Sequence, residues 1–231
     1  MGADDRFTRA AVASTVIVTK IWYRGPKQVR RRLAVFAVVA GLGTGAWVGR
    51  DGLLVSVADR WIVSDPIGPA DAVAVFGGGI LDRPFAAARY YRQGLVRKIL
   101  VSNNGHDSAT EKPDGIVSEV ALTEGILLKL GVPATAIETF GNNLGNTHQE
   151  VLALQAWAER NDVRSIIVPT ETFSTRRVRW MLDRVFGGGH VIRVIALEPP
   201  PFRRDDWWRH WQGITAFRNE ILKYIFYRLI Y

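Results

Sequence analysis

Gly77, Gly78 and Gly79 follow a short β-branched run and precede a segment with helical spacing. Glycine permits left-handed backbone conformations and close approach of a ligand to the main chain. Backbone amides at the junction of a strand and a helix suit phosphate or another anion. Asp82 stands where a dinucleotide fingerprint would need glycine, and no Gly-Lys-Ser/Thr follows. The triplet therefore predicts either another kind of anion site or a tight turn without a ligand.

A second candidate for anion binding begins at Thr170, where hydroxyl-bearing residues lead into Arg176 and Arg177. Together with Arg179, they fall in the first turns of the predicted helix, where arginines oppose the positive end of the helix dipole. Their presence favours an anionic partner, because guanidinium groups bind phosphates and carboxylates with paired hydrogen bonds. That partner is either a ligand or a carboxylate of the chain, such as Glu171 or Asp183.

Other polar side chains follow the second predicted strand or begin the next helix. Asn103 and Asn104 predict either ligand contacts or an ordinary loop. Glu119, near a helix start, is either an acid–base group or a solvated glutamate that favours the helix dipole.

The segment GNTHQE contains a pair with a known local role. Thr147 and Glu150 have the spacing of a capping box, which explains both residues structurally. The capping box does not explain Asn146, which remains a candidate for ligand binding.

The residue types exclude several chemistries. The chain has no cysteine, which rules out disulfides, thiol catalysis and thiolate zinc sites. It has no GxSxG elbow of a serine hydrolase. No HxxxH or HxH spacing predicts a metal site among the four histidines, His106, His148, His190 and His210.

The net charge of +8 lies mostly near the N-terminus. Residues 1–32 hold eight Lys and Arg against two Asp, and the rest of the chain holds 22 basic against 20 acidic side chains. A duplex-binding domain needs its basic stripe in the folded body. We therefore expect no nucleic-acid partner.

From residue 71 onward, apolar runs alternate with segments of helical spacing, which predicts a parallel sheet covered by helices on both faces. In such α/β domains, ligands bind beyond the carboxyl ends of the strands. The domain is expected to span residues 71–231. We expect strands at 71–76, 98–102, 136–139, 164–170 and 191–197, and helices at 83–93, 115–130, 147–159, 173–186 and 207–228.

Residues 33–49 carry no charge, and as a helix they would extend roughly 25 Å, close to the thickness of a bilayer core. Five Lys and Arg precede them within residues 24–32. The positive-inside rule then predicts a transmembrane helix, with residues 1–32 in the cytoplasm and an extracytoplasmic domain after a linker at 50–70. A cleaved signal peptide, with a weak site at Ala58, and a buried core helix are the alternatives.

Gly41, Gly45 and Gly49 fall four residues apart within the predicted span. Such a ridge lets two helix backbones approach closely, which would give a homodimer. Because glycine is common in membrane helices anyway, dimerisation and no dimerisation both stay open.

Residues 207–231 combine Trp, Tyr and Phe with Arg and Lys, and their apolar positions recur every three or four residues. The pattern predicts an amphipathic helix. It favours packing on the sheet as a lid. Contact with lipid headgroups is the alternative, since aromatic and basic residues suit that layer.

In their order along the chain, these segments resemble the SanA/ElyC/YdcF-like family of bacterial envelope proteins. The resemblance covers about residues 70–228 and rests on DAVAVFGGG, KILVSNNG, SEVALTEGILLKLGVPATAIE, GNTHQE, TETFSTRR and WW…NEILKY. It implies a Rossmann-like three-layer α/β/α fold with a mostly parallel sheet, and an anchor in the inner membrane. It also implies a role in envelope biogenesis or polysaccharide metabolism.

The resemblance also implies which polar residues form the site. By motif they are Gly78, Gly79, Arg83, Asn103, Glu119, Asn146, Thr147, Glu150, Thr170, Arg176 and Arg177. The family commonly has a histidine after the fourth strand, where this chain has Ser174. If that histidine is an acid or base, this chain lacks it, and Ser174 and Glu119 are the remaining catalytic candidates.

Three functions are open at this point, and the sequence names no cofactor for any of them. The first is binding or processing of a phosphate-bearing ligand, such as a lipid-linked sugar carrier. The second is binding of a nucleotide or S-adenosylmethionine, for which Asp107 is the one nearby candidate to hold the ribose and which an extracytoplasmic location disfavours. The third is a non-catalytic partner of envelope enzymes, which the replacement of histidine by Ser174 favours.

Overall fold

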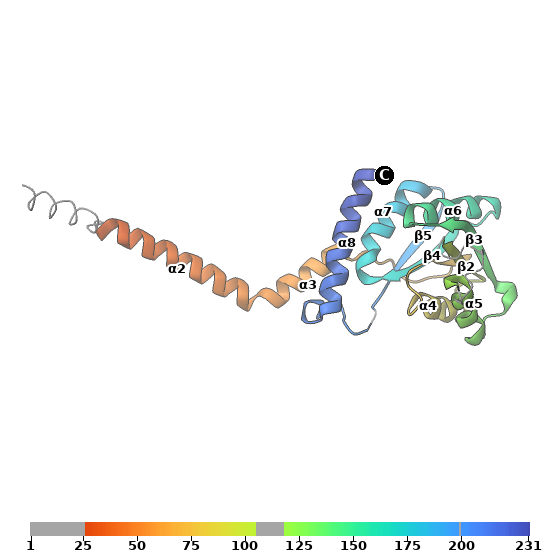
Figure 1. Ribbon diagram of the computed structural model, residues 1–231, viewed down its shortest axis with the longest axis horizontal. Coiled ribbons are helices and arrows are strands. Elements are labelled where there is room, and N and C mark those ends of the chain that lie inside the picture. The colour runs from red at the N-terminus through yellow and green to blue at the C-terminus, as the bar shows by residue number, and fades with distance from the viewer. Residues whose placement is uncertain (1–25, 105–117, 199) are drawn as a thin grey trace, which may run out of the picture. The chain divides into compact units, whose positions relative to one another are not determined.

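The computed structural model describes residues 26–104, 118–198 and 200–231 (Figure 1). The chain divides into two compact units, Met1–Gly52 and Leu53–Tyr231. In the first unit, Pro26–Val48 form helix α2. Its segment Lys27–Val48 is long and apolar enough to cross a membrane and is not buried against the protein. A signal sequence would meet the same criterion, so this helix by itself leaves the choice of anchor or signal open.

Helix α3 (Arg50–Trp61) occupies the first half of the segment predicted as a linker. Its Ala58 is fully buried in an aromatic cluster formed by Phe173, Phe202, Trp207 and Phe217. Contacts with residues more than 100 positions away thus stabilise this helix. No local pattern within residues 50–70 reveals these distant contacts, and the helix is not among the elements predicted from the sequence.

The second unit is built on a five-stranded sheet in the order β3-β2-β1-β4-β5. Every neighbouring pair is parallel, which confirms the predicted α/β class and parallel sheet. β3 is longer than the strand expected at 136–139, because its pairing with β2 continues to Asn104 and Leu144. The strands are β1 (Ala72–Val75), β2 (Lys98–Asn104), β3 (Ile137–Leu144), β4 (Ser165–Glu171) and β5 (Val191–Leu197).

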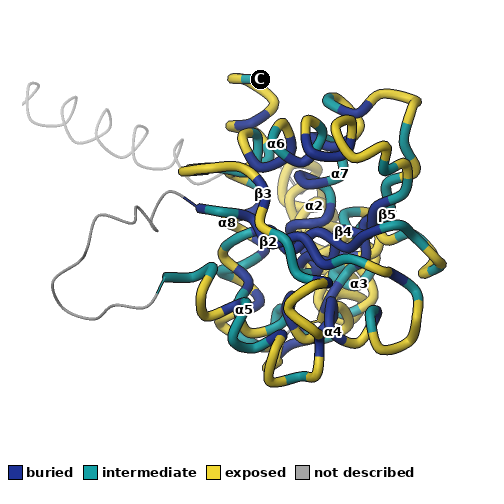
Figure 2. Tube along the Cα trace, turned by 90° about the vertical axis from the view of Figure 1, so that its right-hand side faces the viewer, coloured by how far each residue is buried: buried dark blue, intermediate teal, exposed yellow. Residues whose placement is uncertain are grey.

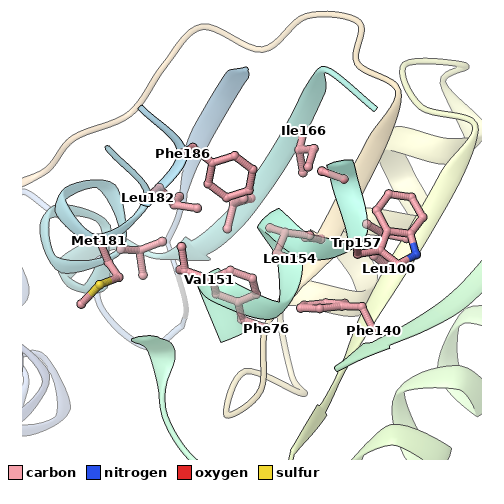
Figure 3. Packing of buried hydrophobic residues seen from close by; sticks show 14 of the residues in the cluster. Phe76, Leu100, Phe140, Val151, Leu154, Trp157, Ile166, Met181, Leu182 and Phe186 are labelled. Atoms are coloured by element: carbon pink, nitrogen blue, oxygen red, sulfur yellow. The ribbon is translucent and has the colours of Figure 1, made fainter. Parts of the chain in front are cut away.

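Helices cover the sheet from both sides (Figures 1 and 2). Side chains of β1 alternate between the faces, as the pleat requires. Val73 packs in a cluster with α4 and α5, whereas Phe76, just past β1, packs with Leu154 and Met181 of α6 and α7 (Figure 3). The helices are α4 (Arg83–Arg92), α5 (Glu119–Lys129), α6 (Thr147–Arg160), α7 (Thr175–Phe186) and α8 (Trp211–Ile230), with short 3-10 turns at Ala134–Ala136, Thr172–Ser174 and Trp207–Arg209.

The strand order reverses direction between β1 and β4. From β1 the chain proceeds through β2 to β3 on one side, and then returns to place β4 on the other side of β1. Connections leave β1 and β4 towards opposite faces at such a point, which opens a crevice beyond their carboxyl ends. The segments that begin at Phe76 and Glu171 border this crevice.

Candidate functional site

A cavity of about 800 Å³ lies at the carboxyl ends of β1 and β4. The loop after β1, the turn after β4, the first turn of α6, and helices α7 and α8 contribute to its walls. Parallel sheets bind ligands at this position. The cavity brings together ten of the residues predicted from sequence, which are Gly77, Gly78, Arg83, Asn104, Glu119, Asn146, Thr147, Glu150, Ser174 and Arg177.

Carboxylate groups of the protein accept the hydrogen bonds of the backbone amides in the glycine loop. The Gly77 amide donates to Glu150 Oε1 at 2.7 Å, and the Gly78 amide donates to Glu119 Oε1 at 2.6 Å. Gly78 has φ +83°, and a Cβ on Gly77 would lie less than 3.0 Å from the side-chain amide of Asn104. Gly78 is therefore favoured by its backbone conformation and Gly77 by the close approach of the Asn104 side chain. A phosphate at these amides would have to displace a carboxylate.

Arg83 uses all of its hydrogen-bond donors inside the protein. Its guanidinium has five N–H groups. Nε and Nη2 donate to the two oxygens of Glu171, at 3.1 and 2.5 Å, and Nη2 also donates to Thr170 Oγ1. Nη1 donates to the carbonyls of Phe76 and Gly77, at 2.9 and 2.6 Å. Arg83 thus ties the end of β1 to the end of β4 and has no donor left for a ligand.

Arg177 is arranged differently. Nε and Nη2 donate to Glu220 of α8, at 2.7 and 3.3 Å, and Nη1 donates to Thr147 Oγ1 at 2.7 Å. Among the described residues, no acceptor uses its remaining two N–H groups. Lys223, one turn after Glu220, donates to Glu220 Oε1 at 2.9 Å and keeps more than half of its side chain exposed. Two cations with unused donors therefore lie among the residues that line the cavity.

The pKa values of two buried carboxyl groups in this cavity are shifted in opposite directions. Burial raises the pKa of Glu150, although hydrogen bonds from Gly77 and Ser102 and the charges of Arg83 and Arg177 act against the shift. Burial alone would also raise the pKa of Glu220, but the hydrogen bond and charge of Arg177, with Lys223, bring it below its ordinary value. Of these two groups, Glu150 is thus the one that holds a proton more readily.

The capping box predicted for Thr147 and Glu150 is absent. Asn146 is the N-cap of α6, and its side chain accepts from the amide of Gln149 at 3.1 Å. Glu150 instead crosses to the sheet, where Ser102 Oγ lies 2.7 Å from its Oε1. Local spacing predicts the cap, but the partners of Glu150 come from β1 and β2, which only the folded sheet brings near.

Four predicted site residues do not line the cavity. Arg176 points to helix α3, where it donates to the carbonyls of Arg60 and Trp61 at the end of that helix. The C-terminal carbonyls of a helix carry partial negative charge and bind cations favourably. The end of α3 therefore takes the place of the anionic partner that was expected for Arg176. The other three are Gly79, Asn103 and Thr170. Thr170 is buried and accepts a hydrogen bond from Arg83.

Of the two carboxylates expected to pair with the arginines of α7, Asp183 does so and Glu171 does not. Glu171, named above as a possible partner for them, pairs with Arg83. Asp183 pairs with Arg179, which also donates to Asp65. Arg177 takes Glu220, which the sequence analysis missed. Glu220 occupies the buried face of α8 with Gly213, Phe217 and Tyr227, so an acidic residue at a core position of an amphipathic helix was the available signal.

The two catalytic candidates lie on separate parts of the wall. Glu119 accepts from Gly78 and, at 3.2 Å, from Asn104. Ser174 is buried in the turn after β4, and its hydroxyl makes no hydrogen bond to a described residue. Gly105, His106 and Asp107 lie outside the described residues.

A metal ion has no ready-made site in the described part of the chain, where no group of three or more His, Asp or Glu is arranged to hold one. The chain matches no protein-family model, no curated protein and no solved structure.

Proposed function

We propose that this chain is a membrane-anchored protein of envelope biogenesis that binds a phosphate-bearing, lipid-linked ligand in the cavity beyond β1 and β4. Helix α2 is the anchor, with the N-terminus in the cytoplasm and a Rossmann-like three-layer domain outside. The uncharged stretch after a basic segment supports this topology. The resemblance to the SanA/ElyC/YdcF-like family supports the assignment to the envelope.

The observation that carries the proposal is the pair of cations on one wall. Arg177 and Lys223 share Glu220 and together carry one more positive charge than it neutralises. Both residues line the cavity, Arg177 from α7 and Lys223 from α8. A phosphate monoester or diester accepts hydrogen bonds from such donors and supplies the missing negative charge.

The raised pKa of Glu150 favours anion binding, because it favours the neutral form of this carboxyl group. The cavity also contains Glu119, Glu171 and Glu220, whose negative charges would repel a phosphate. A neutral Glu150 adds no repulsion and can donate a hydrogen bond to a phosphate oxygen. No hydrogen bond from a described residue reaches its Oε2, so this oxygen is available to carry the proton.

Apolar side chains line the cavity beside the cations. Phe173 and Phe202 stack with ring centroids 5.8 Å apart, and Phe226 of α8 lies on the same lining. A ligand with an apolar chain next to its phosphate matches this combination better than a free phosphate does. Both a lipid-linked phosphate and free inorganic phosphate present the same phosphate group to the cations, and thermal unfolding distinguishes the two ligands.

Thermal unfolding of the full chain in detergent tests the proposal. A polyprenyl phosphate at about 100 times its dissociation constant should stabilise the protein by roughly 2.7 kcal/mol. The polyprenyl alcohol, which lacks the phosphate, and inorganic phosphate alone should stabilise it much less. Lys223→Met should lose the stabilisation, whereas Lys129→Met, an exposed lysine on α5, should keep it.

Three outcomes contradict the proposal. Stabilisation by S-adenosylmethionine or ATP alone would favour the nucleotide-binding alternative. Equal stabilisation of wild type and Lys223→Met would place the phosphate elsewhere. A well-folded protein that responds to none of these compounds would favour the non-catalytic partner of envelope enzymes.

A further inference from the structure

Helix α8 exposes an apolar stripe on the side away from the sheet. Its members recur at intervals of three, four or eight residues and therefore share one face of the helix. Leu229 is 78 % exposed and Trp211 is 69 % exposed, values far above those of a core side chain. The stripe consists of Trp211, Ile214, Leu222, Ile225 and Leu229.

The stripe differs from the rest of the surface of the second unit. Other exposed large apolar side chains occur in the described residues of this unit, such as Leu81 before α4 and Leu152 on α6, but no other described helix of the unit has as many as α8. An exposed apolar surface of this kind marks an interaction surface. The exposed charges on α8 itself are all positive, which fits a negatively charged partner surface; they are Arg218, within the stripe, and Lys223 and Arg228.

The path of the chain limits where this surface can lie. Helix α2 ends at Val48, and Leu53 follows five residues later, a reach of at most about 18 Å. The segment after Leu53 packs on α8, where the ring of Trp61 contacts Phe217 and Tyr224 with centroids 5.5 Å away. Since α2 is the proposed anchor, the start of the second unit is tethered within that reach of the end of the anchor.

We propose that the apolar stripe of α8 lies in the headgroup layer of an anionic membrane. The inference rests on the proposed anchor. Trp and basic side chains beside an exposed apolar face suit this layer, in which the apolar face enters the acyl boundary and the cations meet lipid phosphates. The alternative occupants, a second copy of the chain or another protein, are outcomes of the test.

Membrane contact through α8 gives the cavity a route to its ligand. On the helix, Phe226 lies between Leu222 of the stripe and Lys223 of the cavity lining. A lipid-linked ligand would keep its apolar chain in the bilayer, pass it over Phe226 and place its phosphate at Lys223 and Arg177. The domain then would not have to extract the lipid from the membrane.

The absence of cysteine makes the surface easy to map. We would place a bimane label on single cysteines in the full chain, reconstituted in vesicles with anionic lipid. Leu222→Cys and Leu229→Cys report on the stripe. Leu81→Cys is the matched control, because Leu81 is 80 % exposed and Leu229 is 78 % exposed. Val39→Cys on α2 reports on the anchor.

Lipids that carry a spin label near the headgroup should quench the fluorescence of the labels at positions 222 and 229 and leave the label at 81 unchanged. Aqueous iodide should do the reverse. Equal iodide quenching at 229 and 81, or a disulfide between two Leu229→Cys copies, would overturn the proposal. Shielding from both quenchers would indicate another protein on the stripe and would also overturn it.

The label on α2 separates the two proposals. Lipid quenching at Val39→Cys without quenching at 222 and 229 would leave the anchor intact and reject the surface contact. No lipid quenching at Val39→Cys would reject the anchor itself. The thermal-unfolding test of ligand binding is carried out in detergent and is independent of both results.

Discussion

The two sides of the cavity contain similar ion pairs, which differ in how many N–H donors of the arginine remain for a ligand. On the side formed by the ends of β1 and β4, which we call the loop wall, Arg83 pairs with Glu171. On the side formed by α7 and α8, the helix wall, Arg177 pairs with Glu220. All five N–H groups of Arg83 have acceptors, whereas Arg177 keeps two without one among the described residues. The same residue type therefore serves as scaffold on one wall and as a ligand contact on the other.

The largest expected effect is the loss of the loop-wall arginine. Arg83→Met leaves Glu171 without its cation and the carbonyls of Phe76 and Gly77 without a donor. Removal of one partner from a buried pair costs about 3–5 kcal/mol. Urea unfolding of the full chain in detergent should show this loss. Arg164→Met, at an exposed pair with Asp162, should stay within about 0.5 kcal/mol.

A loss below about 1 kcal/mol in Arg83→Met would contradict the scaffold role of this residue. Arg83 would then be free to contact a ligand, as the sequence analysis expected.

The next largest effect is expected when both members of an ion pair are replaced, which distinguishes the role of the helix wall in ligand binding from its role in stability. Arg177→Met with Glu220→Leu substitutes apolar groups for a buried ion pair, an exchange that is often neutral for stability. We expect the folded protein to persist and to lose the roughly 2.7 kcal/mol of stabilisation by polyprenyl phosphate. Thermal unfolding with and without the lipid measures both quantities.

The matched exchange on the loop wall is Arg83→Met with Glu171→Leu. It should remain destabilised, because the carbonyls of Phe76 and Gly77 still lack a donor. If the two double variants have the same stability, the distinction between the walls is wrong.

Sequence patterns predict the parts of this molecule that local chemistry determines. Apolar β-branched runs and helical spacing are properties of short segments, and they place the strands and the sheet class correctly. The glycine loop is also predicted as a backbone feature, since Gly78 has the left-handed φ that a glycine run suggests.

Partners across the fold are not determined locally. Arg176 and Arg177 are adjacent in sequence, but successive residues of a helix point about 100° apart. One arginine therefore reaches the end of α3 and the other reaches Glu220 of α8. Which of the two faces the cavity depends on where α3 and α8 pack, and no pattern around residues 176 and 177 contains that information.

The smallest expected effect concerns the pH dependence of Glu150, which contacts the loop wall, in contrast to Glu220 on the helix wall. Because the pKa of Glu150 is raised in the folded state, the native protein binds its proton more tightly than the unfolded chain does. Stability from this group is full below the ordinary glutamate value near 4.5 and is lost as the pH rises through the folded pKa. Glu220 has a lowered pKa, so its contribution is lost as the pH falls.

Glu150→Gln cannot titrate and should remove the first of these two trends. Urea unfolding from pH 4.5 upward should show a flatter decline in the variant than in the wild type, by at most about 1.4 kcal/mol per pH unit, the limit for one proton. Glu159→Gln, an exposed position on the same helix α6, should keep the wild-type profile. If Glu150→Gln also keeps it, Glu150 is ionised in the folded protein. The cavity would then hold four charged carboxylates, and a phosphate could bind only where Arg177 and Lys223 outweigh them.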